Sequence, residues 1–221
     1  MRQFLVIAML VAVAPALVAQ DPRLEARLDP ATRAAVAALV DSARASGLPT
    51  EPIIDKALEG TTKRASSDRI IAAIHTLSAD LQAARTALGA TAPDGDVIAG
   101  ASAIRAGAQP EILEQIKGVR GKAGISVPLA VFADLVARGV PADTASNVIL
   151  HLAEGGASDA DYAGLERTVA RDIGAGAPPG ASAAIRARVS TGEVGAAAVG
   201  GPPPGVPATP KDPKGKPASR P

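Results

Sequence analysis

The sequence contains no cysteine and very few aromatic residues. Its 221 residues include no Cys and no Trp, two Phe and one Tyr. The lack of Cys excludes disulfides, thiolate metal sites, a cysteine nucleophile and a lipidated cysteine. With so few rings, any core must be built from Ala, Leu, Ile and Val. Such a core suits closely approaching helices and buries less area per residue than one with several rings.

An excess of charge of one sign is absent as well. The 23 Lys and Arg nearly balance the 22 Asp and Glu, for a formal net charge of +1. The chain as a whole therefore has no long-range field that would recruit nucleic acid, and we expect no specific nucleic-acid partner. A composition of 47% hydrophobic and 20% charged residues is typical of a globular protein.

Residues 1–19 have the layout of a secretory signal peptide. Arg2 precedes an apolar run that begins at Phe4, and small residues stand before Gln20. The segment is short for a membrane span, which takes roughly 20 residues, so we expect cleavage near Ala19 or Gln20. The alternative is an uncleaved single anchor. Cleavage would send the mature protein to the periplasm or the extracellular space, with no transmembrane span.

Glycine and proline divide the rest of the chain into amphipathic segments. Glycine just past a helix end takes the left-handed conformation that caps the last carbonyls, and proline fits the first turn of the next helix. The patterns predict helices from Asp29–Pro30 to Gly47, from Thr50 to Gly60, from Asp68 to Leu88, from the Asp94–Gly95–Asp96 turn to Gly107, from Pro110 to Ile116, from near Pro128 to Arg138, from Asp143 to Gly155, from Ser158 to Gly176 and from Ala181 to Val189. A glycine-rich turn is expected from Gly118 to Gly124.

Four of these joints share a glycine followed closely by a proline. The glycines are Gly47, Gly107, Gly139 and Gly176, at spacings of 60, 32 and 37 residues. Spacings in the thirties fit stacked helical hairpins, and their irregularity leaves an ordinary helical domain as an equal alternative. The predicted fold is all-α: an array or compact bundle of about eight to nine helices in antiparallel hairpins over residues 20–190. Residues 191–221, rich in Pro, Gly and Lys, are expected to form a disordered tail.

Runs such as Leu58-Glu59-Gly60 and Ala137-Arg138-Gly139-Val140-Pro141 resemble those of exported Ala- and Arg-rich helical proteins of bacteria. The resemblance covers the helical region. It transfers no functional residue and no activity to this chain.

Catalytic motifs are absent from the sequence. There is no Gly-x-Ser-x-Gly and no Ser-x-x-Lys. His151 and Glu154 have the spacing of two metal ligands on one helical face, but zinc takes three or four ligands. The pairs Asp94 with Asp96 and Asp159 with Asp161 fall at helix starts, where capping explains them. We therefore expect a protein without metal or cofactor that is not an enzyme.

Basic side chains gather at two inter-helix turns and in the tail. Candidate contacts to an anionic ligand or partner are Lys63, Arg64, Lys117, Arg120, Lys122, Lys211, Lys214 and Lys216. If the helices stack, the two turns share an edge of the molecule. The simpler interpretation is a solvated turn whose charge keeps the protein soluble.

The sequence is compatible with three functions. The first is an exported scaffold or adaptor that acts through protein–protein contacts in the cell envelope. The second is an envelope-associated protein that binds an anionic polymer or lipid head group through the basic turns and the tail. The third is an enzyme whose site is assembled from scattered polar residues, which no spacing in the sequence favours.

Overall fold

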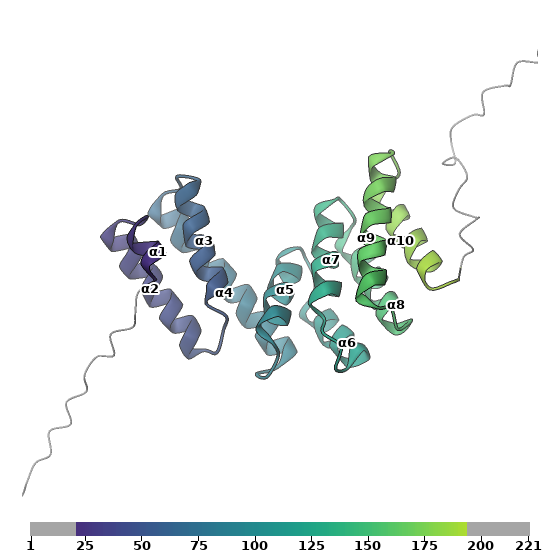
Figure 1. The fold of residues 1–221 in the computed structure, drawn as a ribbon, viewed down its shortest axis with the longest axis horizontal. Helices are drawn as coiled ribbons and strands as arrows, with labels where there is room; N and C mark the ends of the chain where they lie inside the picture. Colours follow the sequence, from purple (N-terminus) through teal and green to yellow (C-terminus); the bar gives the residue numbers. More distant parts are fainter. Residues whose placement is uncertain (1–20, 194–221) are drawn as a thin grey trace, which may run out of the picture. The chain divides into compact units, whose positions relative to one another are not determined.

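The described part of the chain consists of helices and the turns that join them. The computed structural model describes residues 21–193, drawn as a ribbon in Figure 1. Within this range there are ten α-helices and no β-strand, which confirms the all-α prediction. The predicted signal peptide and residues 194–221 of the predicted tail lie outside the described residues. The helices are α1 (Pro22–Glu25), α2 (Pro30–Ala45), α3 (Glu51–Thr62), α4 (Ser67–Leu88), α5 (Asp94–Arg105), α6 (Pro110–Arg120), α7 (Ser126–Ala137), α8 (Ala142–Glu154), α9 (Asp159–Gly174) and α10 (Pro179–Ser190).

One short helix was not predicted. Asp21 caps α1 by accepting a hydrogen bond from the amide of Arg23, and Pro22 occupies the first helical position. This is the same Asp-Pro start that predicted α2, where Asp29 accepts from the amides of Ala31 and Thr32. The signal for α1 was therefore present in the sequence.

The predicted end of α6 was wrong. The helix continues past Ile116 to Arg120, and Gly121, with a φ of 59°, stands just after its last residue. Gly118 lies inside the helix, where its conformational freedom costs about 1 kcal/mol relative to Ala. Lys117 and Arg120 therefore project from a helix and not from a turn, and their hydrogen bonds to the carbonyls of Leu88 and Ala157 help to offset this cost.

A single capping arrangement ends most of the helices. At the end of α7, the amide of Val140 donates to the carbonyl of Leu135, and that of Gly139 donates to the carbonyl of Val136. The same pair of bonds ends α3, α5, α8, α9 and α10. Gly139 has a φ of 91°, and the other three glycines of the predicted joints also have positive φ. This confirms the physical reading of the joints as left-handed caps.

The described residues form two compact units. Unit 1 contains α1, α2, α3 and the part of α4 up to Thr76. Its core includes Val36, Ile53 and Ile74, each with no exposed surface. The hydroxyl of Thr32 on α2 donates to that of Ser67, at the start of α4, over 2.6 Å.

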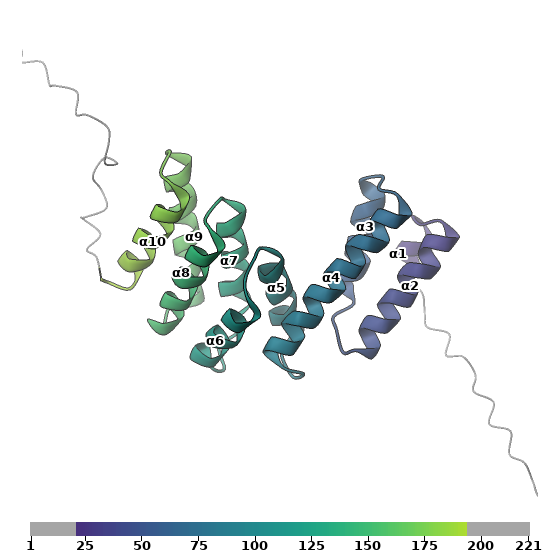
Figure 2. The same ribbon diagram turned by 180° about the vertical axis from the view of Figure 1, so that it is seen from behind.

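Unit 2 contains the rest of α4, from Leu77, and α5 to α10. Here the helices stack in two layers: α5 packs on α7 and α7 on α9, while α6 packs on α8 and α8 on α10. Figure 1 shows the first layer toward the viewer and Figure 2 the second. The two layers also pack on each other, α7 on α8 and α9 on α10, so each helix contacts helices that are near it in the chain, as in proteins built from repeated helical hairpins.

The two aromatic residues of the described range anchor the core of unit 2. Phe132 on α7 and Tyr162 on α9 have no exposed surface, and the hydroxyl of Tyr162 donates to the carbonyl of Ile149 over 3.3 Å. Aliphatic side chains and alanines fill the remaining core, as the composition required.

None of the helices within residues 21–193 has both the length and the apolar composition that crossing a bilayer requires.

Candidate functional site

The predicted basic residues lie in both units. Lys63 and Arg64 follow α3 in unit 1, whereas Lys117, Arg120 and Lys122 belong to unit 2. The tail residues Lys211, Lys214 and Lys216 lie outside the described residues. The two basic turns belong to different units, so their expected position on one edge of the molecule stays a prediction.

Arg120 ties α6 to the start of α9. Its guanidinium donates to the carbonyls of Gly124 and Ala157, each over 2.9 Å, and pairs with the carboxylate of Asp159 over 2.6 Å. The guanidinium carbon also lies 5.3 Å from the ring centroid of Tyr162, within the range of a cation–π interaction. The side chain is only 8% exposed, so most of its hydrogen-bonding capacity is used inside the protein.

The other two cations of this turn have different surroundings. The ammonium of Lys117 donates to the carbonyl of Leu88 at the C-terminus of α4, where a positive charge complements the helix dipole. Lys122 is exposed in the turn that follows α6. The three residues therefore do not converge on one exposed patch, and Arg120 and Lys117 hold helices together.

In unit 1, Lys63 takes part in an ion-pair cluster on α3. Its ammonium and that of Lys56 both bond to the carboxylate of Glu59. These two hydrogen bonds lower the pKa of Glu59 to about 2, so the carboxylate is charged at neutral pH. Each ammonium has three donors, which leaves both lysines with hydrogen-bonding capacity beyond Glu59.

Arg64 adopts a backbone conformation that glycine occupies at the other joints. Its φ is 54°, and among residues 21–193 it is the only non-glycine residue with positive φ. Its amide donates to the carbonyl of Thr61 over 2.9 Å, and that of Ala65 donates to Gly60, which completes the same cap. The left-handed conformation costs an L-residue roughly 1 kcal/mol. A long cationic side chain, that of Arg64, is therefore attached to a strained backbone position next to Lys63.

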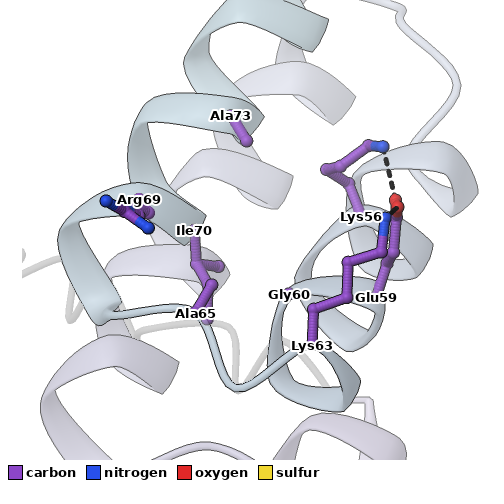
Figure 3. A pocket seen from close by; sticks show the side chains of 8 residues that line it. All are labelled: Lys56, Glu59, Gly60, Lys63, Ala65, Arg69, Ile70 and Ala73. Carbon is purple, nitrogen blue, oxygen red and sulfur yellow. Dashed lines mark hydrogen bonds and ion pairs between the residues drawn. The ribbon is translucent and has the colours of Figure 1, made fainter.

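A hollow opens between α3 and the first turns of α4, beside this cluster. Its volume is about 210 Å³, and Figure 3 labels the eight residues that line it. Gly60, Ala65, Ile70 and Ala73 provide apolar surface. Lys56, Glu59 and Lys63 lie on one side of Ile70 in the figure, and Arg69 lies on the other. The hollow was not predicted, because the helix was expected to end at Gly60; it continues to Thr62, and Lys56, Glu59 and Lys63 lie along one face at its end.

A second candidate surface lies in unit 2, between α5 and α7. A shallow groove of about 420 Å³ is lined by Gly95, Ile98, Ala99, Ser102, Ser126, Val127 and Ala130. No lining residue is charged, and most are small. Ile98 is 36% exposed, which makes it one of the few large apolar side chains of the described residues that face solvent.

The paired acidic residues have structural contacts. Asp161 forms a capping box with Ser158 at the start of α9, as predicted, while Asp159 pairs with Arg120. Asp94 and Asp96 do not cap α5, whose N-cap is Pro93; this part of the capping prediction was wrong. Instead Asp94 pairs with Arg85, and Asp96 accepts hydrogen bonds from the amides that begin α7.

His151 pairs with the end of α10 and not with Glu154. Its Nε2 lies 3.1 Å from the hydroxyl of Thr191 and 3.1 Å from a carboxylate oxygen of Glu193. Within the described residues, no group of three or more His, Asp or Glu side chains is arranged to hold a metal ion.

The hollows of the described residues include a basic-rimmed one in unit 1 and an uncharged groove in unit 2. Neither contains a nucleophile with an adjacent base, the arrangement that nucleophilic catalysis requires. No protein-family model, no curated protein and no solved structure matches this chain.

Proposed function

We propose that this chain is an exported, non-enzymatic helical protein that acts through protein–protein contacts as a scaffold or adaptor in the cell envelope. The observation that carries the proposal is the uncharged groove between α5 and α7 on the stacked hairpins of unit 2. Stacked hairpins present extended surfaces that recognise other proteins, and exposed apolar patches commonly mark such contacts.

The lining of the groove favours a protein partner over an anionic polymer. Ala99, Ala130 and Ser102 have short side chains, so a partner helix can approach closely, and Ile98 offers an apolar contact at the edge. An amphipathic helix recognises such a groove by its apolar face. A polyanion would gain nothing from a surface without cations.

Export is the second part of the proposal and rests on residues 1–19. A positive charge, an apolar run and small residues before Gln20 are the elements that the secretion machinery recognises. Sequencing the N-terminus of the protein isolated from the periplasm or culture medium of its native host tests this. A mature chain that starts within a residue or two of Gln20 is the expected result, and an intact Met1 in the membrane fraction would contradict it.

The contact function is tested by cross-linking in the native host with a charge placed in the groove. Ala130→Glu puts a carboxylate on an exposed position of α7 that lines the groove. The matched control, Ala160→Glu, puts the same side chain on an exposed position of α9 outside the groove lining. We expect a partner, identified by mass spectrometry, to be captured by the unmodified protein and by Ala160→Glu.

For Ala130→Glu we expect the captured amount to fall at least about tenfold, because a charge buried in an interface without a counter-ion is costly. Circular dichroism of both variants checks that the helices are intact. Equal capture by the two variants, or no captured partner in any of the three proteins, would refute the proposed use of this groove.

A further inference from the structure

The hollow of unit 1 exists because two helices approach each other closely at a glycine. A Cβ atom added to Gly60 on α3 would lie 2.6 Å from Cγ1 of Ile70 on α4, well inside van der Waals contact. Ile70 is 4% exposed and lines the hollow where the helices meet, and the other apolar lining side chains, Ala65 and Ala73, are small. The result is an apolar hollow that opens to solvent (Figure 3).

The rim of the hollow carries an excess of positive charge. Three of its lining side chains are cationic, Lys56, Lys63 and Arg69, and one is a carboxylate, Glu59, which leaves two positive charges uncompensated. Arg64 stands next to Lys63 and is exposed. The chain as a whole is nearly neutral, so this local excess is not a property of its composition.

The conformation of Arg64 adds a separate observation. The cap after α3 has the same hydrogen bonds as those after α5, α7, α8, α9 and α10, but those five have glycine at the left-handed position. Glycine would avoid the strain, and strained backbone is retained mainly where function requires the side chain. Arg64 lies between Lys63 and Ala65 in the chain, and both of these neighbours line the hollow.

We propose that this hollow binds a phosphate monoester, with the phosphate on the basic rim and a small apolar body on the floor formed by Ile70 and Ala73. A phosphate monoester carries close to two negative charges at neutral pH and three acceptor oxygens, which suits the net positive charge of the rim and the ammonium donors of Lys56 and Lys63 that Glu59 does not use. A volume of about 210 Å³ leaves room for an organic group beside the phosphate. This site is independent of the groove in unit 2.

The test is isothermal titration of the protein, purified as it accumulates in its native host, with phenyl phosphate and with inorganic phosphate. We expect phenyl phosphate to bind about tenfold more tightly, because its ring buries apolar area that inorganic phosphate lacks. Ala73→Leu fills the hollow, and should remove this preference while leaving inorganic phosphate unaffected. Equal affinity for the two probes would overturn the assignment.

Removing a positive or a negative charge from the rim should change the affinity for phenyl phosphate in opposite directions. Lys63→Gln should weaken phenyl phosphate binding about fivefold or more, because one charge-assisted hydrogen bond is lost. Glu59→Gln should strengthen it, because Lys56 and Lys63 lose their internal acceptor. The matched control is Lys122→Gln, which removes the same charge from an exposed turn of unit 2. A loss with Lys122→Gln equal to that with Lys63→Gln, or no gain with Glu59→Gln, would overturn the site.

Vesicles distinguish the two sources of such a phosphate. Phosphatidylcholine vesicles with and without phosphatidic acid, whose head group is a phosphate monoester, are sedimented with each variant. Binding that needs phosphatidic acid and Lys63 identifies a lipid head group, and phenyl phosphate binding without vesicle binding identifies a soluble ester. Binding of neither probe refutes the proposal.

Discussion

Replacing Arg120 separates a structural role from a role in partner binding. The sequence placed Arg120 among the candidate contacts to an anionic partner, whereas its guanidinium bonds to two carbonyls and a carboxylate within unit 2. We therefore predict that Arg120→Ala lowers the free energy of unfolding of unit 2. Arg120→Lys, which keeps the charge, should also lower it.

The size of the effect follows from the exposure of each contact. A hydrogen bond from a charged donor contributes about 1.5–3 kcal/mol when it is sheltered, and the bond to Ala157 crosses from α6 to the start of α9. Asp159 is 56% exposed, so its ion pair adds at most about 1 kcal/mol. The contact with Tyr162 adds about 0.5–1 kcal/mol. Because these terms are not additive, we expect a loss of about 3 kcal/mol for Arg120→Ala.

The lysine variant should lose roughly half as much, about 1.5 kcal/mol, because an ammonium lacks the planar fork that reaches several acceptors at once. Tyr162 supplies the assay: it is the one Tyr in a chain without Trp, and it is fully buried in unit 2. Urea unfolding followed by tyrosine fluorescence therefore reports on unit 2, whereas circular dichroism at far-ultraviolet wavelengths sums over both units.

Two results would refute this reasoning. A loss below about 1 kcal/mol for Arg120→Ala would mean that the buried contacts contribute little. A lysine variant as stable as the unmodified protein would mean that charge alone matters at this position, as expected of a contact to an anionic partner.

Three further predictions concern stability. Phe132→Ala should lower the free energy of unfolding by about 3–5 kcal/mol in urea, since the ring is fully buried; a loss below about 1 kcal/mol would contradict its role in the core. Arg64→Gly should raise it by about 0.5–1 kcal/mol by relieving the positive φ, while Arg64→Ala, which removes the charge and keeps the strain, should not. Hydrogen bonds from Arg186 lower the pKa of Asp172 below its ordinary value of 3.8, so this pair stabilises the protein above that pH and loses the contribution as the pH falls below it. Between pH 5 and pH 2, Arg186→Gln should therefore lose less stability than the unmodified protein; parallel urea titrations that fall equally would contradict this.

The joints between helices were predictable because their causes are local. A left-handed conformation at Gly107 or Gly139 depends on a missing Cβ, and a helix start at Asp29–Pro30 depends on one side chain and one ring. Such signals act over a few residues. The helix count therefore came out close, and the one unpredicted helix, α1, has the same start signal at Asp21.

Signals that depend on distant residues were misread. Gly118 indicated a turn after Ile116, but α6 continues to Arg120, because Lys117 and Arg120 bond to carbonyls 29 and 37 residues away. The residues around Arg120 in the sequence do not indicate that its guanidinium bonds to the carbonyl of Ala157. The stacking order of unit 2, with α5 on α7 and α6 on α8, likewise depends on which apolar faces meet.

The sequence alone determined an all-α protein with glycine-capped joints, a core that must be mainly aliphatic, and no catalytic motif. The hydrophobic periodicity of a helix, its capping residues and the overall composition depend only on residues that are near one another in the chain or on simple sums, so they can be predicted from the sequence. Only the tertiary structure decided which cations are used internally and which remain available. Whether a cation is available depends on residues that are distant in the sequence and close in space. The side chain of Arg120 is 8% exposed and surrounded by hydrogen-bond acceptors, whereas Lys63 lies on the rim of an open hollow.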